Sequence, residues 1–490
     1  MNEPIRLAIV GAGNRGRFSY GRWCRHRPDL ARVVAVAEPD PVRRADMSEE
    51  HSIAPEREYS DWRELIGNLA GIDAVIIATL DDKHVEPAVD FLKAGMDILL
   101  EKPIAPTHAG IERVRAAARE SRGTVTIGHV LRYTPMFGTL KRLIDDGAIG
   151  ELRGINHAEH VGFRLFTHGY VRGNWRRKEL SSPIILSKCC HDLDLMRWWA
   201  GARWTSVSST GELTQFRSDR APEGAPDYCL DGCPIESSCP FHAGRYYIDN
   251  NPDPDEHPIS VITNDPSTEG RVAALRSGPY GRCVYRCDND VPDHQESVFT
   301  FENGVRASFT MTAFAAEGAR LTRLFGTRGD IVGDPRAGTI TIHRYSPAPH
   351  FAVPSGARGG PKLTAGADTS QARSYVQTEI VEARPDPDVF PGHGGGDDGL
   401  MRAFVAHVRE RSGQAREDAD AGERGRARRR GDSPRSGRRG GRDAEEPTSA
   451  LTSLDESFES HEMAFAAERS RLIENAVRPS DLRESLEETQ

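Results

Sequence analysis

The sequence predicts an α/β protein in two parts: a doubly wound parallel sheet, then an α+β domain with an open, mainly antiparallel sheet. Apolar runs that suit buried strands alternate with helical patterns through the first 128 residues, which is typical of parallel βαβ units. From about residue 151, strand-like runs follow one another, and Asn303-Gly304 between two of them suits a tight hairpin turn. At 490 residues, the chain is also too long for one ordinary core.

Composition argues against several classes of function. The formal net charge is −9, and Lys and Arg are spread over most of the chain, so a nucleic-acid or anionic-membrane surface is not expected. No run of about 18 apolar residues exists, and we expect no membrane span. The first strand begins at once, which leaves no room for a signal peptide, so we expect a cytoplasmic protein.

A glycine-rich loop after the first strand predicts a dinucleotide site. The apolar run 7–10 is followed by Gly11, Gly13 and Gly16 in G-x-G-x-x-G spacing, with Asn14 and Arg15 inside the loop. The first glycine permits the tight turn, the second lets the backbone approach a pyrophosphate, and the third lets helix and strand pack closely. We therefore expect a Rossmann domain over residues 1–128, with these five residues at the cofactor.

An acidic residue at the end of the second strand favours NAD(H). Glu38 follows the run 32–37 and lies about 20 residues beyond the last glycine. Its carboxylate can accept both ribose hydroxyls and would repel a 2′-phosphate. Arg43 and Arg44 lie close by, so NADP(H) is not excluded.

Further strands of the first domain end on polar residues. We expect strands over 73–79, 97–101 and 124–128, and helices over 83–94 and 109–119. Ligands of such sheets bind beyond the carboxyl ends of the strands. The residues that fall at these ends are Thr79, Glu101, Lys102 and His129.

Residues 129–408 are expected to form the substrate domain. Its strand-like runs are 152–162, 204–213, 297–302, 305–314 and 321–326. Residues 216–295 interrupt it as a long insertion rich in Cys, Pro, Gly and Asp.

The last part of the chain has two predicted segments. Residues 409–450 have no aromatic residue and no aliphatic residue larger than Ala, so we expect disorder there, with a reading-frame artefact as an alternative. Residues 451–490 are expected to return to the core as a helix. Ser453 and Glu456 form its capping box, and its apolar face is expected to consist of Phe458, His461, Phe465 and Leu472.

Two short motifs carry candidate chemistry. Lys102 follows a buried strand, where a partly desolvated lysine can donate a proton or a hydrogen bond to an alkoxide, although a surface lysine in a proline turn fits the tripeptide equally well. His191 precedes an apolar helix, and Asp194 shares its helix face three residues later. A histidine with an acidic neighbour can act as general base for a hydroxyl. Arg132 and Tyr133, among other polar and aromatic residues near the domain boundary, suit a polyhydroxy substrate.

Together, the motifs GAGNRG, EKP at 101–103 and HDLD at 191–194 resemble those of the Gfo/Idh/MocA oxidoreductases. The resemblance extends to residues 128–152 and 393–405 and covers most of the chain. It implies a nicotinamide cofactor between the domains and hydride transfer to or from a sugar, cyclitol or related polyol. By resemblance, Lys102 and His191 are catalytic, Asp194 binds substrate hydroxyls, and His84 lies near the nicotinamide.

Two departures and two alternatives accompany this resemblance. Many members have Pro after the Thr of the third strand motif, where this chain has Leu80 after Thr79. Many members carry an Asp four residues before the catalytic His, where this chain has Ser187; Lys188 or Asp192 can compensate. An NAD-dependent glycosidase that works by transient oxidation and elimination is an alternative, and so is a non-catalytic dinucleotide-binding regulator. The resemblance also implies a homo-oligomer that acts on a small molecule.

The cysteines of the insertion leave two interpretations open. Cys229, Cys233 and Cys239 are followed by Cys283, and tetrahedral zinc takes four such ligands in closely spaced pairs. Cys287 and His242 exceed the four ligands needed. A structural zinc ion is therefore one interpretation, and free thiols or a single disulfide are the other.

Overall fold

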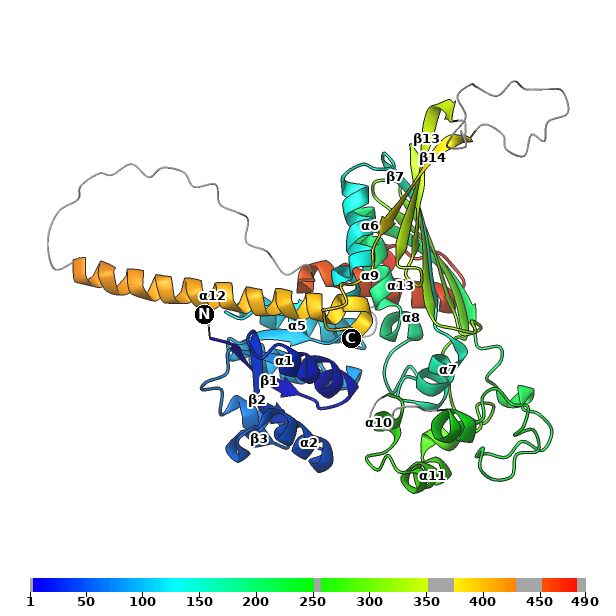
Figure 1. The fold of residues 1–490 in the computed structure, drawn as a ribbon, viewed down its shortest axis with the longest axis horizontal. Helices are drawn as coiled ribbons and strands as arrows, with labels where there is room; N and C mark the ends of the chain where they lie inside the picture. The colour runs from blue at the N-terminus through cyan, green and yellow to red at the C-terminus, as the bar shows by residue number, and fades with distance from the viewer. Residues whose placement is uncertain (1–2, 251–256, 351–373, 429–451, 483–490) are drawn as a thin grey trace, which may run out of the picture.

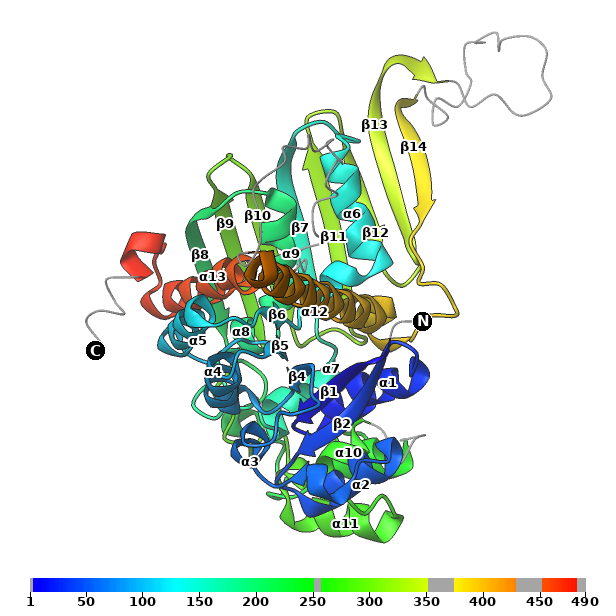
Figure 2. The same ribbon diagram turned by 90° about the vertical axis from the view of Figure 1, so that its left-hand side faces the viewer.

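The computed structural model describes residues 3–250, 257–350, 374–428 and 452–482. Two sheets organise these residues (Figures 1 and 2). The first is a parallel sheet with helices on both faces, and the second is a larger, mostly antiparallel sheet. Both predicted sheet types are confirmed.

The first sheet has six strands in the order β3-β2-β1-β4-β5-β6, and every neighbouring pair is parallel. Its strands are β1 (Ile5–Val10), β2 (Ala31–Ala37), β3 (Glu58–Tyr59), β4 (Ala74–Ile77), β5 (Asp97–Leu100) and β6 (Val125–Ile127). Side chains of β4 alternate between two cores: Ala74 and Ile76 join one, while Val75 and Ile77 join the other. Burial on both faces explains why its strands are continuous apolar runs in the sequence.

Five helices belong to this sheet: α1 (Arg22–His26), α2 (Pro41–His51), α3 (Trp62–Ile66), α4 (Val85–Lys93) and α5 (His108–Glu120). Phe91 of α4 and Val114 of α5 share one core, while Trp23 of α1 and Met47 of α2 share the other. The helices thus cover both faces of the sheet, as a doubly wound fold requires.

The second sheet has eight strands in the order β14-β13-β12-β11-β7-β10-β9-β8. Its strands are β7 (Leu152–His160), β8 (Trp204–Glu212), β9 (His294–Phe301), β10 (Arg306–Thr312), β11 (Ala319–Gly326), β12 (Gly329–Asp334), β13 (Thr339–His350) and β14 (Ser374–Glu382). Only β7 and β10 pair in parallel. Helices α6 (Pro135–Asp145), α9 (Cys190–Ala200) and α13 (Leu454–Ile473) lie on one side of it in both views (Figures 1 and 2).

Three strands of this sheet were not predicted from the sequence. The strand patterns were recognised only as far as Gly326, whereas the sheet continues through β12, β13 and β14. β12 reads GDIVGD, and Gly and Asp are depleted in strands. Pairing with neighbours on both sides outweighs this weak local preference.

The predicted disorder from residue 409 is wrong for its first part. Helix α12 (Gly396–Arg428) continues without interruption through residues 409–428. A helix closes its hydrogen bonds locally, and the Arg, Glu, Ala and Gln of this stretch have good helix propensity, so large apolar residues are not required. Residues 429–450 lie outside the described residues.

The last helix returns to the core between the two sheets. Ser453 caps α13 by accepting a hydrogen bond from the Glu456 backbone N–H, as predicted. Phe458 and His461 are buried, but Leu472 is 56 % exposed, so its predicted place on the apolar face is wrong. Before α13, Ile127 N–H donates to the Thr452 carbonyl at 2.8 Å; after it, Val477 exchanges backbone hydrogen bonds with Val207. The same short segment therefore extends both domains.

The insertion between β8 and β9 forms a small unit of its own. Helices α10 (Ile259–Ile262) and α11 (Thr268–Ser277) pack around a separate core of six buried residues: Cys229, Ala243, Tyr247, Ile259, Leu275 and Tyr280. In both views α10 and α11 lie beside α2 of the first domain (Figures 1 and 2). Asn264, which follows α10, donates a hydrogen bond to Asp40 at 3.0 Å and joins the insertion to the parallel sheet's side.

Candidate functional site

A large cleft of about 1040 Å³ opens at the carboxyl ends of the parallel strands. One wall is the glycine loop after β1, together with the ends of β2 and β4. The opposite side comes from Asn174, Trp175 and the residues around α10, namely Ser260, Val261, Thr263, Asn264 and Pro266. The cleft therefore lies between the first domain and the insertion, where doubly wound folds bind nucleotides.

The three glycines have different structural roles. A Cβ at Gly11 would lie 2.7 Å from the Ala78 carbonyl oxygen, and Gly11 has φ +94°. A Cβ at Gly16 would lie 1.9 Å from the Gly11 carbonyl oxygen. A Cβ at Gly13 would meet nothing within 4 Å, although Gly13 lines the cleft. Gly11 and Gly16 thus serve the packing of the loop, while Gly13 leaves room on the cleft side for a ligand.

Glu38 ends β2 with its carboxylate held in the cleft wall. Its Oε2 accepts from the Ala12 N–H at 2.6 Å, and its Oε1 accepts from the Asp40 N–H at 3.0 Å. Each oxygen keeps a lone pair for a further donor such as a ribose hydroxyl. Arg43 also lines the cleft, whereas Arg44 donates to the backbone carbonyls of Glu38 and Pro39.

Thr79 supplies an unpaired polar atom to the same cleft. It lines the cleft after β4, and its Oγ1 is buried without a hydrogen-bond partner among the described residues. A buried hydroxyl without a hydrogen-bond partner destabilises the folded protein unless a ligand or water binds it. This atom, the open space at Gly13 and the Glu38 carboxylate together fit a dinucleotide.

His84 lies between two loops and not among the residues that line the cleft. Its Nδ1 lies 2.7 Å from the Pro103 carbonyl oxygen and its Nε2 lies 3.2 Å from that of Thr79. The ring therefore connects the backbone after β4 to the backbone after β5, which carries Lys102.

Arg15 and Glu101 bind one another beneath the glycine loop. Arg15 Nε donates to Glu101 Oε1 at 2.5 Å, and its Nη2 pairs with Asp397 at 2.9 Å. Tyr20 also donates to Glu101 Oε1, at 2.6 Å. Burial raises the pKa of Glu101, but the charges of Arg15 and Lys102 outweigh it, so this pKa lies below its usual range. Tyr20 and Asp397 were missed from the sequence; Tyr20 lies only five residues from Arg15, whereas Asp397 lies 382 residues away.

Lys102 and His191 lie near one another where the two domains join. Lys102 Nζ donates to the Ser187 carbonyl at 2.9 Å, just before α9, whose first turn carries His191. His191 is buried, and its Nδ1 has no hydrogen-bond partner among the described residues. Burial lowers the pKa of His191 well below its usual range, and the neighbouring Lys102 and His129 lower it further. The imidazole is therefore neutral at pH 7, which is the form that a general base needs.

The three residues expected at the substrate have protein partners in this structure. Asp194 accepts from Arg132 Nε and Nη2, both at 2.7 Å, and the pair is almost completely buried. Arg132 also pairs with Glu456 at 3.0 Å. Tyr133 OH lies 2.9 Å from Thr452 Oγ1. These contacts fix the start of α9, and hence His191, against the segment that leads into α13.

The two residues expected to compensate for Ser187 bind elsewhere. Asp192 lies 2.9 Å from His157 Nε2 and accepts from Arg320 Nε at 2.7 Å. Lys188 pairs with Glu159 at 3.3 Å. Within the described ranges, their partners thus belong to a buried polar cluster behind α9 that does not include His191.

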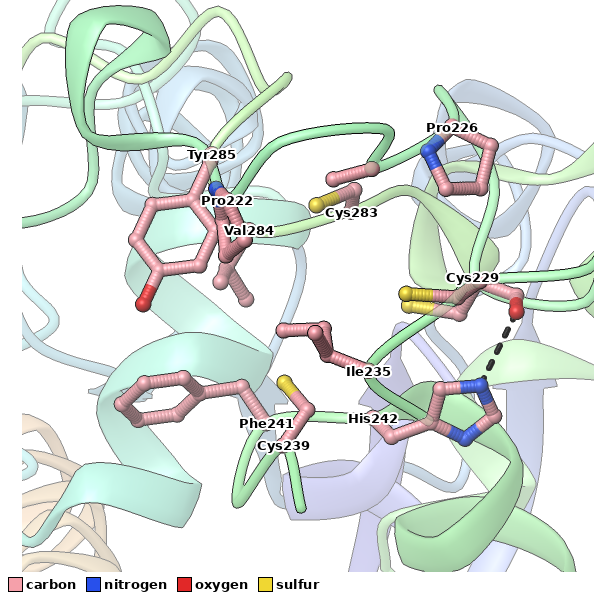
Figure 3. Close-up of a pocket in the computed structure, with 12 residues that line it drawn as sticks. Pro222, Pro226, Cys229, Ile235, Cys239, Phe241, His242, Cys283, Val284 and Tyr285 are labelled. Atoms are coloured by element: carbon pink, nitrogen blue, oxygen red, sulfur yellow. Dashed lines mark hydrogen bonds between the residues drawn. The ribbon is translucent and has the colours of Figure 1, made fainter. Parts of the chain in front are cut away.

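The four cysteines proposed as zinc ligands meet in the insertion. Cys229, Cys233, Cys239 and Cys283 line one small cavity, with His242 at its edge (Figure 3). Cys287 does not line it. All eight cysteines are free thiols, and among the residues described no three His, Cys, Asp or Glu side chains already stand in a metal-holding arrangement. No helix in the described ranges is long and apolar enough to cross a membrane.

Comparisons with known proteins agree with this architecture. Residues 5–129 match the oxidoreductase family with an NAD-binding Rossmann fold, and residues 137–230 match the GFO/IDH/MocA C-terminal domain. YteT of Bacillus subtilis is 28 % identical over 268 residues, which cover 53 % of this chain and 59 % of YteT. Inositol 2-dehydrogenase 2 of Saccharopolyspora erythraea is 34 % identical over 199 residues, which cover 40 % of this chain and 54 % of that protein. The chain thus spans less than two thirds of the length of these relatives.

A solved structure extends the similarity to the whole fold. Levoglucosan dehydrogenase in complex with NADH and L-sorbose superposes with a TM-score of 0.62 at 16 % identity. The match covers 97 % of this chain and 99 % of that one. At this identity the likeness concerns the fold alone.

Proposed function

Because this chain belongs to the Gfo/Idh/MocA family of oxidoreductases, we propose that it is an NAD(H)-dependent dehydrogenase of a sugar, cyclitol or related polyol. One observation carries the proposal: Lys102 and a neutral, buried His191 lie near one another, where Lys102 of the glycine-lined first domain binds the Ser187 carbonyl of the second. When bound, the nicotinamide supplies the acceptor or donor of hydride. The named relatives that act on inositol and levoglucosan support a polyhydroxy substrate.

The side chains of the proposed centre divide the work on one hydroxyl. His191 accepts the hydroxyl proton on a ring nitrogen as the carbon loses hydride, and returns the proton in the reverse direction. One Lys102 proton binds the Ser187 carbonyl, which leaves two that can hydrogen-bond the same substrate oxygen as it gains negative charge. The Arg132–Asp194 pair holds α9 in place, so we assign it to positioning His191. Gly13, Glu38 and Thr79 are assigned to the cofactor, with Glu38 favouring NAD(H) over NADP(H).

The proposal is tested first by native mass spectrometry and then by turnover. Protein that binds one NAD(H) per subunit is then supplied with a panel of polyols, and NADH absorbance is followed. We expect His191→Asn to keep NADH affinity and to lose about 10²–10⁴-fold in kcat, the range of general-base catalysis. Lys102→Met is expected to lower kcat as well. His343→Asn and Lys141→Met are matched controls, because both side chains lie away from the cleft and pair with Asp330 and Asp145.

One contact across the cleft favours the glycosidase alternative. Asn264 of the insertion binds Asp40, and the α10 segment lines the cleft opposite Glu38, which favours slow release of a bound nucleotide. An enzyme that oxidises and re-reduces its substrate within one turnover needs such retention. Cleavage of a glycoside without net NADH formation would replace the dehydrogenase proposal. Unchanged turnover of His191→Asn would remove His191 from either mechanism.

We also infer that the chain forms a homo-oligomer through the second sheet. The sheet face away from α6, α9 and α13 carries exposed apolar side chains: Val298 is 50 % exposed, Leu321 49 % and Ile380 66 %. Exposed apolar side chains on an open sheet face suit a protein interface. Light scattering after size-exclusion chromatography tests this; we expect an oligomer that Leu321→Arg dissociates, and a monomeric wild type would refute it.

A further inference from the structure

The insertion contains a small cavity whose walls are rich in sulfur. Its volume is about 10 Å³, which is enough for roughly one water molecule. The sulfur atoms of Cys229, Cys239 and Cys283 gather around this space, and Cys233 also lines it (Figure 3). Phe241, Val284, Tyr285 and Ile235 complete an otherwise apolar lining. These thiols come from two segments of the sequence, and 43 residues lie between Cys239 of the first and Cys283 of the second.

A buried guanidinium lies against this cluster, and its hydrogen-bond partners among the described residues include no carboxylate. Arg172 is 1 % exposed; its Nε donates to the Arg282 carbonyl and its Nη2 to the Phe241 carbonyl, both at 2.7 Å. Nη2 also lies 3.6 Å from Cys229 Sγ, and Nη1 has no hydrogen-bond partner among the described residues. Arginine stays protonated in proteins, and a buried charge without a counter-charge is unfavourable. The cluster therefore needs a negative charge close to Cys229.

We propose that Cys229, Cys233, Cys239 and Cys283 bind one zinc ion as a tetrathiolate site, with Arg172 as its buried counter-cation. Four Zn–S bonds form, and the four thiol protons leave to solvent. The resulting centre carries a charge of −2, and Arg172 neutralises half of it. One centre thus accounts for the cavity, the converging sulfurs and the unpaired guanidinium. The site ties the two ends of the insertion together, away from the cofactor cleft, and does not depend on the proposed function.

The structure also selects the four ligands from the candidates. Cys287 lies outside the cavity, and its Sγ donates to the Cys283 carbonyl at 3.3 Å. His242 lines the cavity, but its Nε2 lies 2.9 Å from the Cys229 carbonyl oxygen (Figure 3). Because the described side chains do not yet stand in a metal-holding arrangement, ligation requires rotation of the cysteines about χ1, their one side-chain torsion to sulfur. The small volume favours a single tetrahedral ion over an iron–sulfur cluster.

Elemental analysis of the full-length protein, expressed with zinc and purified without chelator, tests the site. We expect about one zinc per chain. Cys233→Ser is expected to reduce this to near zero, while Cys287→Ser, in the same segment as Cys283, is expected to keep it. Arg172→Gln is expected to weaken zinc retention against a competing chelator, because it removes the counter-charge. Circular dichroism of each variant shows whether the fold persists.

A second measurement avoids variants that fail to fold. Titration of the wild-type protein with an organomercurial reagent, in the presence of a colorimetric zinc indicator, should release zinc as thiols are consumed. Replacement of zinc by Co²⁺ should give the intense visible bands of tetrahedral thiolate coordination. Absence of metal in wild type, iron with acid-labile sulfide, or loss of zinc in Cys287→Ser would each overturn the proposal as stated.

Discussion

The different roles of Gly13 and Gly16 give the sharpest prediction. Gly13 has φ −75° and ψ −165°, an extended conformation that alanine adopts, and an added Cβ would meet no protein atom within 4 Å. Gly13→Ala should therefore leave stability unchanged or raise it by about 0.4–1 kcal/mol, because alanine restricts the unfolded chain. The methyl group would instead occupy space in the cleft where a pyrophosphate approaches. Overpacking of about 1–3 kcal/mol corresponds to roughly 5- to 150-fold weaker NADH binding.

Thermal unfolding and NADH fluorescence titration separate the two effects. The matched variant Gly16→Ala places its Cβ 1.9 Å from the Gly11 carbonyl oxygen and 3.0 Å from its carbon, so backbone must shift and stability should fall. Gly13→Ala should thus lose affinity without losing stability, and Gly16→Ala should lose stability. If Gly13→Ala bound NADH as tightly as wild type, the cofactor would not approach this glycine and the assignment of the loop would fail.

Four further predictions concern the charges of the site. Glu38→Ser should lower the NADH-to-NADPH affinity ratio, because it removes the repulsion of a 2′-phosphate; an unchanged ratio in paired titrations would show that Glu38 does not select the cofactor. The folded-state pKa of His191 lies well below 6.5, so the neutral form dominates at pH 7. We therefore expect kcat/KM to be constant around pH 7 and to fall only as the pH drops through that lowered pKa. A fall in kcat/KM centred at or above pH 6.5 would contradict this assignment. Because this pKa is lower in the folded protein than in the unfolded chain, the unfolded chain takes up the proton at a higher pH. The free energy of unfolding should therefore decrease as the pH falls below 6.5, and urea unfolding at several pH values measures this. Arg132→Met should cost about 3–5 kcal/mol of unfolding free energy, since it leaves Asp194 charged and buried. If Arg132→Met lost less stability than Arg32→Met, which removes an exposed arginine, this reasoning would be refuted.

Local patterns in the sequence were sufficient for most of the fold. β4 and β5 are apolar because both faces of a parallel sheet are buried, so their period and length can be read from the sequence. The strands β12 and β14 could not be found in this way. β14 in particular is exposed along most of its length, so it has no buried side to produce an alternating pattern, and it is held by backbone pairing with β13.

The candidate site divides in the same manner. The glycine loop, Glu38, Lys102 and His191 could be named from the sequence because each belongs to a short motif with a local chemical reason. The sequence contains no corresponding pattern for Asp397, which reaches Arg15 from 382 positions away, because nothing local distinguishes it from any acidic residue at a helix start.

By itself, the sequence therefore determined the type of each domain. It also indicated the glycine loop proposed for the cofactor and the lysine and histidine of the proposed centre, because each has a local chemical reason. Only the tertiary structure decided which charges are already neutralised. Arg132 and Asp194 suit a polyhydroxy substrate when they are considered alone, yet in the fold they bind one another. It likewise separated Cys287 from the four cysteines that share a cavity. The physical reason is that pairing, burial and cavity shape depend on contacts between residues far apart in the chain, which no local spacing specifies.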